Sequence, residues 1–473
     1  MERWIGLLGI ALFIGLGWAL SRERKAIHWR TILWGLGLQW LFAVVVLKGE
    51  AIKAALAFLP WPTLHRFHAG TSGQWDAQAG WIVLLLMFLP MLLRRFARFE
   101  HRRLNWGIFG VVILGLLRGN LVGHAFDQMR VIVQHLMDYA HAGAAFVFGS
   151  LADPGGSVGL VFAFVVLPTI LFIASLFAIL YYLGVMQWVV GASARAMGRF
   201  LKVSGAESVS VAASILMGQT EAPLTIRPFL AGLTRSELMV IMTAGMAHVS
   251  GSIMVAYVQV AHVDIVHLIT AVIMTAPGAV MMAKLLEPET EEPETASVGG
   301  QLSVDIPNHD ANLLDAAARG AFEGGQLAFN VAVMLIAFIA LVSLMNGLVH
   351  AVNPAWSLEL GLGWLFRPVA FLMGVPWSEA GQVGGLLGKR MVVNEFVAFL
   401  DLGQMTMLSA KAKLIATFAL CGFANFSSIA IQVGGIGALV PERRSDLARL
   451  GLKAMLAGTL ANFLSACIAG VLM

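Results

Sequence analysis

The stretch Gly218-Gln219-Thr220-Glu221-Ala222-Pro223 is one of two polar strings in an otherwise apolar chain, and the other is Asn394-Glu395-Phe396-Val397-Ala398. An ionisable side chain near the centre of a bilayer costs about 3 kcal/mol even on the mildest insertion scales, so a glutamate in each string indicates a polar cavity enclosed by protein. A buried structural pair is the alternative. Because other hydrogen-bonding side chains accompany each glutamate, the strings favour a binding site for a polar solute within a transport protein.

The composition predicts a membrane protein with many spans. Of 473 residues, 59% are hydrophobic and only 12% are charged, whereas soluble chains carry about 25% charged residues. The net charge of +4 therefore gives no reason to expect nucleic acid as a partner. Short basic runs, such as Arg22 to Lys25, lie beside apolar segments, which is typical of cytoplasmic loops. We expect a multi-pass protein of a bacterial inner (plasma) membrane, in contact with the lipid bilayer, with both termini in the periplasm.

Uninterrupted apolar segments supply most of the predicted spans, because a spanning helix needs about 20 apolar residues. They cover residues 4–20, 32–48, 80–93, 107–124, 159–186, 327–349 and 448–472. Residues 125–142 instead show one apolar stripe with charged residues elsewhere around the helix, which predicts an interfacial helix on the membrane. An ordinary amphipathic helix packed on other helices is the alternative there.

Two apolar regions, 195–231 and 363–400, are interrupted by glycine and proline. Each is long enough for a re-entrant hairpin, whose freed backbone groups need a polar cavity lined by protein. Each is followed by a glycine-interrupted segment, read as a broken helix, and then by another helix. Such interrupted segments in matching positions of two repeats point to the binding site of a secondary transporter.

The predicted fold is an all-α polytopic membrane protein with about ten membrane-spanning helices and two re-entrant helical hairpins. It contains inverted repeats of hairpin, broken helix and helix. The predicted divisions are N-terminal scaffold helices with an extra helical pair and an interfacial helix (1–142), a scaffold helix (143–194), the first transport repeat (195–283), an acidic loop with a connecting helix (284–326), a scaffold helix with a connection (327–362) and the second transport repeat (363–473).

The polar strings also carry a resemblance to a known family. The chain resembles bacterial members of the concentrative nucleoside transporter family, from about residue 143 to the end and more faintly over the first two helices. The motifs are Gly218 to Leu224, Gly388 with Arg390 leading into Asn394 to Phe399, and Cys421 to Ser428. This resemblance implies a homotrimer whose protomers each have a scaffold domain and a transport domain that moves like an elevator. The segment at about 62–124 departs from the shortest bacterial members and predicts an extra helical pair.

The resemblance also assigns roles within a nucleoside site. It implies that Glu395, Asn425 and Ser428 recognise the ribose, since an ionised carboxylate can accept hydrogen bonds from two hydroxyl groups. It implies that the base is bound by Gln219 and Thr220, and by Glu221 through a water molecule. Two apolar residues, Ile253 and Phe423, are expected to shape the pocket walls, with plain core packing as the alternative.

The coupling cation is where the chain departs from its sodium-coupled relatives, which use an asparagine and a serine side chain together with backbone carbonyls. Ser214 and His248 stand at those positions. Carbonyl groups of Ser214, Met217, His248 and Val249 remain suitable ligands for Na⁺. A histidine also suits H⁺, because imidazole titrates near neutral pH. The alternative for His248 is a neutral imidazole that only bonds to carbonyls.

The predicted function is cation-coupled nucleoside symport, with a nucleoside such as uridine as substrate, Na⁺ or H⁺ as the coupling ion and no resident cofactor. A facilitative nucleoside carrier and a membrane nucleoside receptor are the rivals. An intramembrane enzyme is disfavoured, because the segments carry no paired catalytic aspartates, no strong Ser/His motif and no metal-type His-x-x-x-His. The chain is therefore not expected to be an enzyme.

Overall fold

The computed structural model describes residues 2–55, 121–153, 161–296 and 310–473, and all regular structure within these ranges is helical. The predicted span at 80–93, most of the one at 107–124 and most of the extra pair lie outside them. The chain divides into two compact units, residues 1–43 with 130–473 and residues 44–129. In the smaller unit the structure describes the end of α2, all of α3 and the start of α6.

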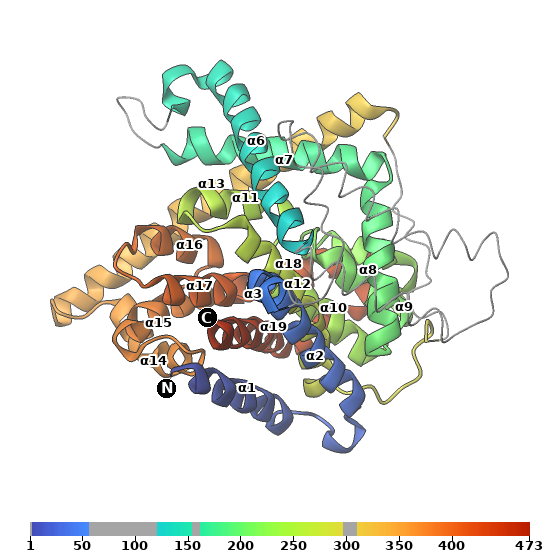
Figure 1. The fold of residues 1–473 in the computed structure, drawn as a ribbon. Coiled ribbons are helices and arrows are strands. Elements are labelled where there is room, and N and C mark those ends of the chain that lie inside the picture. Colours follow the sequence, from blue (N-terminus) through green and yellow to red (C-terminus); the bar gives the residue numbers. More distant parts are fainter. Residues whose placement is uncertain (1, 56–120, 154–160, 297–309) are drawn as a thin grey trace. The chain divides into compact units, whose positions relative to one another are not determined.

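The elements follow one another along the chain as Figure 1 shows. The first half contains α1 (Glu2–Ala19), α2 (Trp29–Leu47), α3 (Gly49–Ala55), α6 (Leu121–Phe148), α7 (Phe162–Tyr182), α8 (Val185–Leu201), α9 (Gly205–Ser214), the 3₁₀ segment η4 (Ala222–Gly232), α10 (Arg235–Ala247), α11 (Gly251–Ala261) and α12 (Ile265–Leu286). The second half contains α13 (Leu313–Val352), α14 (Leu358–Leu372), α15 (Trp377–Val392), α16 (Glu395–Gln404), α17 (Ala410–Leu420), α18 (Phe426–Leu439) and α19 (Arg444–Leu472). Short 3₁₀ turns are η1 (Arg24–Ala26), η3 (Gly149–Ala152) and η5 (Pro441–Arg443).

Several helices are long and apolar enough to cross a membrane. Six such spans occur among the described residues, or seven if α14 and α15, which are bent by 117° relative to each other, count as one. α1 is apolar but falls among the shorter helices. The all-helical class and the presence of several apolar spans are thus confirmed, and the predicted total of about ten spans stays a prediction.

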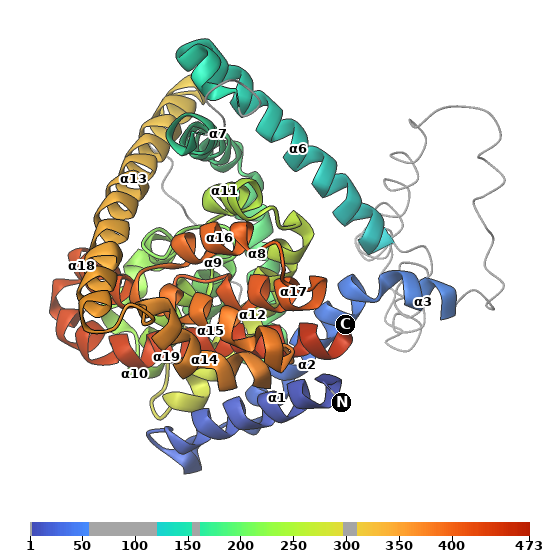
Figure 2. The same cartoon turned by 90° about the vertical axis from the view of Figure 1, so that its left-hand side faces the viewer.

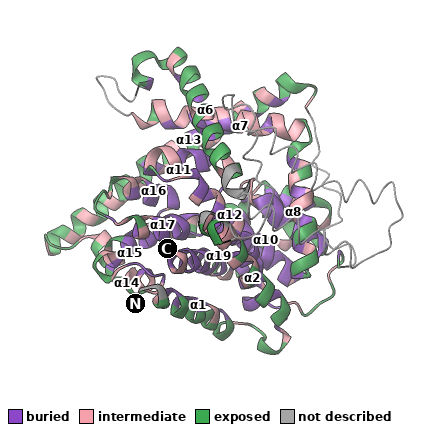
Figure 3. Cartoon of the chain, viewed as in Figure 1, coloured by how far each residue is buried: buried purple, intermediate pink, exposed green. Residues whose placement is uncertain are grey.

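The helices α10, α12 and α19 are largely buried and pack on one another. Figure 3 shows them largely in the colour of buried residues. Close approach at the middle of this group depends on a glycine, because a Cβ atom at Gly458 of α19 would lie 3.3 Å from atoms of Met246 and Ala247 in α10. The breaks in α10–α11 and α17–α18 adjoin this core.

The order hairpin, broken helix, helix occurs twice. The first set is α9 with η4, then α10 with α11, then α12, and the second is α15 with α16, then α17 with α18, then α19. Capping boxes start two helices of the first set, with Ser204 paired to Glu207 before α9 and Thr234 paired to Glu237 before α10.

The helix boundaries differ in part from the predicted hairpin ranges. Residues 195–201 complete the amphipathic helix α8, so the first hairpin begins at Gly205, and its second arm is 3₁₀ rather than α-helical. Residues 363–372 complete α14, so the arms of the second hairpin are α15 and α16, which meet at Val393 and Asn394.

A separate pair is formed by α7 and the 40-residue helix α13. Figure 2 shows α13 as one long helix with α7 beside it. The pair packs closely because a Cβ atom at Gly320 or Gly324 would lie under 3.0 Å from atoms of α7. α7 also contacts α11, which links the pair to the first repeat. The predicted interfacial segment 125–142 lies within α6, which confirms its helical state.

Candidate substrate site at the helix breaks

Two asparagines begin the helices that follow the breaks in the second repeat. Asn394 caps α16 by accepting a hydrogen bond from the backbone N–H of Val397 (2.9 Å), and Asn425 caps α18 by accepting one from Ser428 (2.9 Å). Glu395 is therefore the first residue of α16. The partial positive charge at a helix N-terminus favours a carboxylate at this position.

The carboxylate of Glu395 is buried and held by two donors. The Tyr257 hydroxyl donates to Oε1 at 3.0 Å, and the Asn425 amide donates to Oε2 at 3.2 Å. Tyr257 is itself fixed by stacking on Phe399, with ring centroids 4.3 Å apart. Each carboxylate oxygen keeps a lone pair, so the group can still accept hydrogen bonds from two neighbouring hydroxyls.

The first hairpin reaches the same place through Gln219. Its amide nitrogen donates to the Ser428 hydroxyl at 3.2 Å, which joins residue 219 to a residue 209 positions later in the chain. Its neighbour Thr220 lies against α18, because a Cβ atom at Gly435 would be 2.6 Å from the Thr220 methyl group. The structure thus brings Gln219, Ser428, Asn425 and Glu395 into one hydrogen-bonded chain.

The remaining predicted substrate residues lie outside that chain. The side chain of Glu221 is exposed and turns back to accept a hydrogen bond from the Gly218 N–H (3.0 Å). Ile253 is buried in the first turn of α11, and Phe423 is half-buried in the break between α17 and α18. Both side chains can form part of an apolar wall of the site.

The predicted cation residues also converge. The Gly251 N–H donates to the Leu216 carbonyl at 3.1 Å, and this bond holds the turn after α9, with Ser214 and Met217, against the break after α10, with His248 and Val249. The Ser214 hydroxyl donates to the Ser210 carbonyl of its own helix (2.9 Å).

His248 ends α10 and is buried. Its Nδ1 lies 2.7 Å from the Ala244 carbonyl and must carry a proton to bond there. Nε2 makes no hydrogen bond among the residues that the structure describes. In the neutral ring, Nε2 is therefore the atom that can take up a further proton.

The two breaks are connected by residues that had no predicted role. Arg390 is fully buried and donates to the carbonyls of Ala419 and Gly422 and to the side chain of Asn462. The Asn462 amide in turn donates to the carbonyls of Ala247 (2.9 Å) and Cys421 (3.0 Å). Carbonyls left unpaired where the two helices break are satisfied in this way. Arg390 occurs in a quoted motif, whereas Asn462 and Tyr257 sit in apolar stretches without a local signal.

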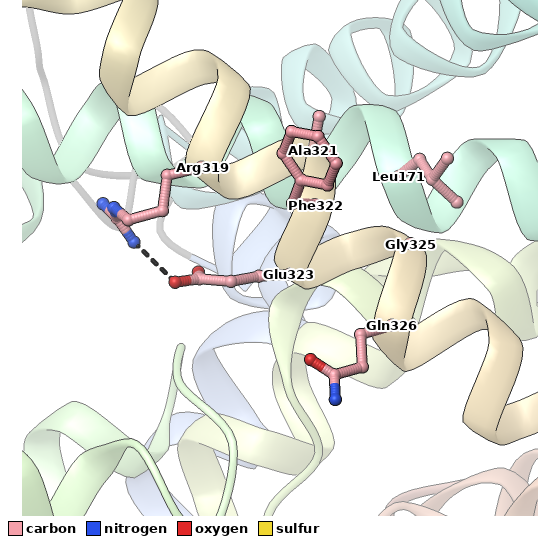
Figure 4. Close-up of a pocket in the computed structure, with 7 residues that line it drawn as sticks. All are labelled: Leu171, Arg319, Ala321, Phe322, Glu323, Gly325 and Gln326. Carbon is pink, nitrogen blue, oxygen red and sulfur yellow. Dashed lines mark hydrogen bonds and ion pairs between the residues drawn. The ribbon is translucent and has the colours of Figure 1, made fainter.

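A different concavity lies on the α7–α13 pair. This groove is open and has a volume of about 640 Å³, and Arg319 pairs there with Glu323 at 2.9 Å. Figure 4 shows the residues that line it. Its lining comprises Leu171 of α7 and, from α13, Arg319, Ala321, Phe322, Glu323, Gly325 and Gln326. It contains none of the predicted site residues, so it is separate from the hydrogen-bonded chain around Glu395.

Known proteins are similar to this chain in sequence and in fold. Residues 267–470 match the family described as Na⁺ dependent nucleoside transporter C-terminus, residues 8–60 match its N-terminus, and residues 163–263 match the description nucleoside recognition. The uncharacterised transporter YutK of Bacillus subtilis is 46% identical over 369 residues, which cover 77% of this chain and 89% of that protein. The chain belongs to the concentrative nucleoside transporter family.

Other members of the concentrative nucleoside transporter family support the same conclusion. The nucleoside permease NupC of Helicobacter pylori is 40% identical over 354 residues, covering 72% of this chain and 83% of that one. The solved structure of CNTnw in an inward-facing substrate-bound state matches with a TM-score of 0.79 and 36% identity over 100% of this chain and 99% of that one. The chain is therefore a multi-pass membrane transporter and not an enzyme, as predicted.

Proposed function

We propose that the protein is a cation-coupled nucleoside symporter that moves nucleosides such as uridine into the cell. The observation that carries the proposal is the hydrogen-bonded chain from Glu395 through Asn425 and Ser428 to Gln219, which joins the two hairpins. It offers a carboxylate for vicinal hydroxyls at one end and amide and hydroxyl groups for a base at the other. These are the two polar ends of a nucleoside.

The proposed roles follow from the different chemical groups at the two ends of this hydrogen-bonded chain. Glu395, with Asn425 and Ser428 beside it, binds the ribose hydroxyls, and Tyr257 holds the carboxylate in place. Gln219 and Thr220 bind the base edge, and Glu221 joins them through water. Ile253 and Phe423 form apolar walls around the sugar and base, since most small-molecule sites are apolar with a few placed polar groups.

The coupled cation is proposed to bind between the turn after α9 and the break after α10. Sodium would use the backbone oxygens of Ser214, Met217, His248 and Val249. A proton would instead bind Nε2 of His248. The Ser214 hydroxyl donates its proton to the Ser210 carbonyl, and its oxygen keeps lone pairs with which it can also ligate sodium.

We also propose an elevator mechanism in a homotrimer. The two repeats form the moving transport part, and α7 with α13 belongs to the scaffold. This division is supported by the contacts between the α7–α13 pair and the repeats, which involve few elements, chiefly α7 against α11. Native mass spectrometry in detergent tests the assembly, and a mass other than that of three chains would refute it. Both termini are proposed to face the periplasm.

The test of function is radiolabelled uridine uptake into proteoliposomes under an inward Na⁺ gradient, with pH and voltage equal on both sides. Uphill accumulation identifies a sodium symporter. Uridine exchange without accumulation, followed by uphill uptake under an inward H⁺ gradient, identifies a proton symporter. Exchange with no accumulation under either gradient would instead establish a facilitative carrier. Protein that binds uridine but shows neither uptake nor exchange would be a receptor.

A further inference from the structure

One fully buried amide, that of Gln432 on α18, contacts the candidate site without belonging to the predicted set. Its Nε2 lies 3.1 Å from the Met242 backbone carbonyl and 3.3 Å from Oε1 of Gln219. Its own Oε1 makes no hydrogen bond within the described part of the chain. A buried acceptor without a partner is costly, so packing alone is a poor explanation for a glutamine here.

These contacts determine the orientation of the side-chain amides of Gln432 and Gln219. A backbone carbonyl can only accept, so the Gln432 atom that faces Met242 must be the nitrogen. The same nitrogen also faces the end of the Gln219 side chain, so the Gln219 atom there must be the oxygen. The Gln219 nitrogen is consequently the atom directed at the Ser428 hydroxyl, 3.2 Å away.

The contact between the Gln432 and Gln219 side chains has room because Gly245 has no side chain. A Cβ atom at Gly245 would lie 2.6 Å from Nε2 of Gln432 and 3.1 Å from Cβ of Gln219. Helix α10 therefore leaves a space at this point that the Gln432 amide occupies.

We propose that Gln432 is a positioning residue for nucleobase recognition. It holds the Gln219 oxygen toward the protein interior and so leaves the second Gln219 N–H, the one not donated to Ser428, for the substrate. The site then favours nucleobases with a carbonyl oxygen at the edge that meets Gln219, such as uracil and hypoxanthine, over those with an amino group there, such as cytosine and adenine. This inference rests on the proposed nucleoside function.

The test measures dissociation constants of purified protein for uridine, cytidine, inosine and adenosine by calorimetry. Wild-type protein is expected to bind uridine more tightly than cytidine, and inosine more tightly than adenosine, by about fivefold to tenfold, the usual effect of one hydrogen bond. Gln432→Met keeps the length of the side chain but frees Gln219 to turn, so both preferences should fall close to one. Gln432→Glu accepts rather than donates and turns the Gln219 nitrogen toward itself, so both preferences should reverse.

Gln187→Met is the matched control. It removes another amide, on α8, whose nitrogen donates to the Tyr181 carbonyl (2.8 Å) outside the site, and it should leave both preferences unchanged. Equal weakening for all four nucleosides in the Gln432 variants would mark a structural role and overturn the inference. Wild-type protein that binds uridine and cytidine equally would overturn it without any variant, whereas wild-type protein that binds no nucleoside would instead refute the proposed function.

Discussion

Glu395 is the single residue on which the proposed substrate site most depends. Glu395→Gln replaces a carboxylate oxygen that accepts with an amide nitrogen that donates, while the shape is kept. Uridine affinity should fall at least 100-fold, because charge-assisted hydrogen bonds to two hydroxyls are lost, at about 1.5–3 kcal/mol each. Calorimetry on purified protein measures this effect, with an unchanged elution volume as the control for assembly. Unaltered uridine affinity would remove Glu395 from the site.

His248 permits a second test at the residue scale. If Nε2 of His248 carries the coupled proton, His248→Ser should abolish uridine accumulation driven by a pH gradient while uridine exchange continues. Proteoliposome uptake with and without the gradient measures both activities. Accumulation driven by the pH gradient at the wild-type rate would exclude His248 as the proton carrier.

Sequence reasoning found the residues of the site that stand in polar strings. Glu395, Asn425, Ser428 and Gln219 lie in motifs where a polar side chain is conspicuous among apolar neighbours, and the structure brings them together. The supporting residues were missed for a physical reason. Tyr257, Gln432 and Asn462 lie in mostly apolar helices, and their partners are 30 or more positions away in the chain.

At the scale of elements, the close packing of α7 and α13 predicts a contrast between neighbouring glycines. A Cβ atom at Gly324 would lie 2.7 Å from Cβ of Ala174 and 2.9 Å from the backbone of Leu171, whereas one at Gly325 meets nothing within 4 Å. Gly324→Ala should therefore destabilise the protein by about 1–3 kcal/mol through overpacking. Gly325→Ala should be neutral or slightly stabilising, since alanine favours a helix more than glycine does. Thermal unfolding in detergent compares the two, and equal melting temperatures would contradict this packing.

The sequence predicted the order of elements better than their ends. Glycine and proline marked hairpins and broken helices, because proline removes a helical hydrogen bond and glycine disfavours a helix through its conformational freedom. They did not separate α8 from the first hairpin, where the boundary is a left-handed residue, Lys202, followed by the Ser204–Glu207 capping box. In the same way, Gly374, which has a positive φ, lies between α14 and α15. The region contains many glycines, so its sequence does not show which of them forms the turn.

At the scale of the larger unit, one buried carboxylate holds several elements together. Glu287, directly after α12, pairs with Arg22 beyond α1 (2.8 Å), Arg235 of α10 (2.7 Å) and Lys453 of α19 (3.0 Å). Its backbone carbonyl also accepts a hydrogen bond from Ser236 (2.7 Å). Four segments distant in sequence therefore converge on one charge, and Glu287 itself lies outside the predicted membrane spans.

This cluster predicts a dependence of stability on pH. Burial alone would raise the pKa of Glu287, but hydrogen bonds from Arg22 and Lys453 and the charges of Lys453 and Arg235 outweigh it and hold the pKa below its usual value. The carboxylate therefore stabilises the fold above the ordinary glutamate pKa of about 4.3, and this contribution is lost as the pH falls through the lower pKa of the folded state.

Glu287→Gln should lower the free energy of unfolding by about 1–3 kcal/mol at pH 7, as expected for lost hydrogen bonds to a charged group. The difference from wild type should shrink below about pH 4, because wild-type Glu287 is then also becoming neutral. Melting temperatures in detergent between pH 7 and 3 measure the difference, with Glu442→Gln, at an exposed residue of η5, as the matched control. A gap between wild type and Glu287→Gln that stays constant over this range would show that the ion pairs do not stabilise the fold.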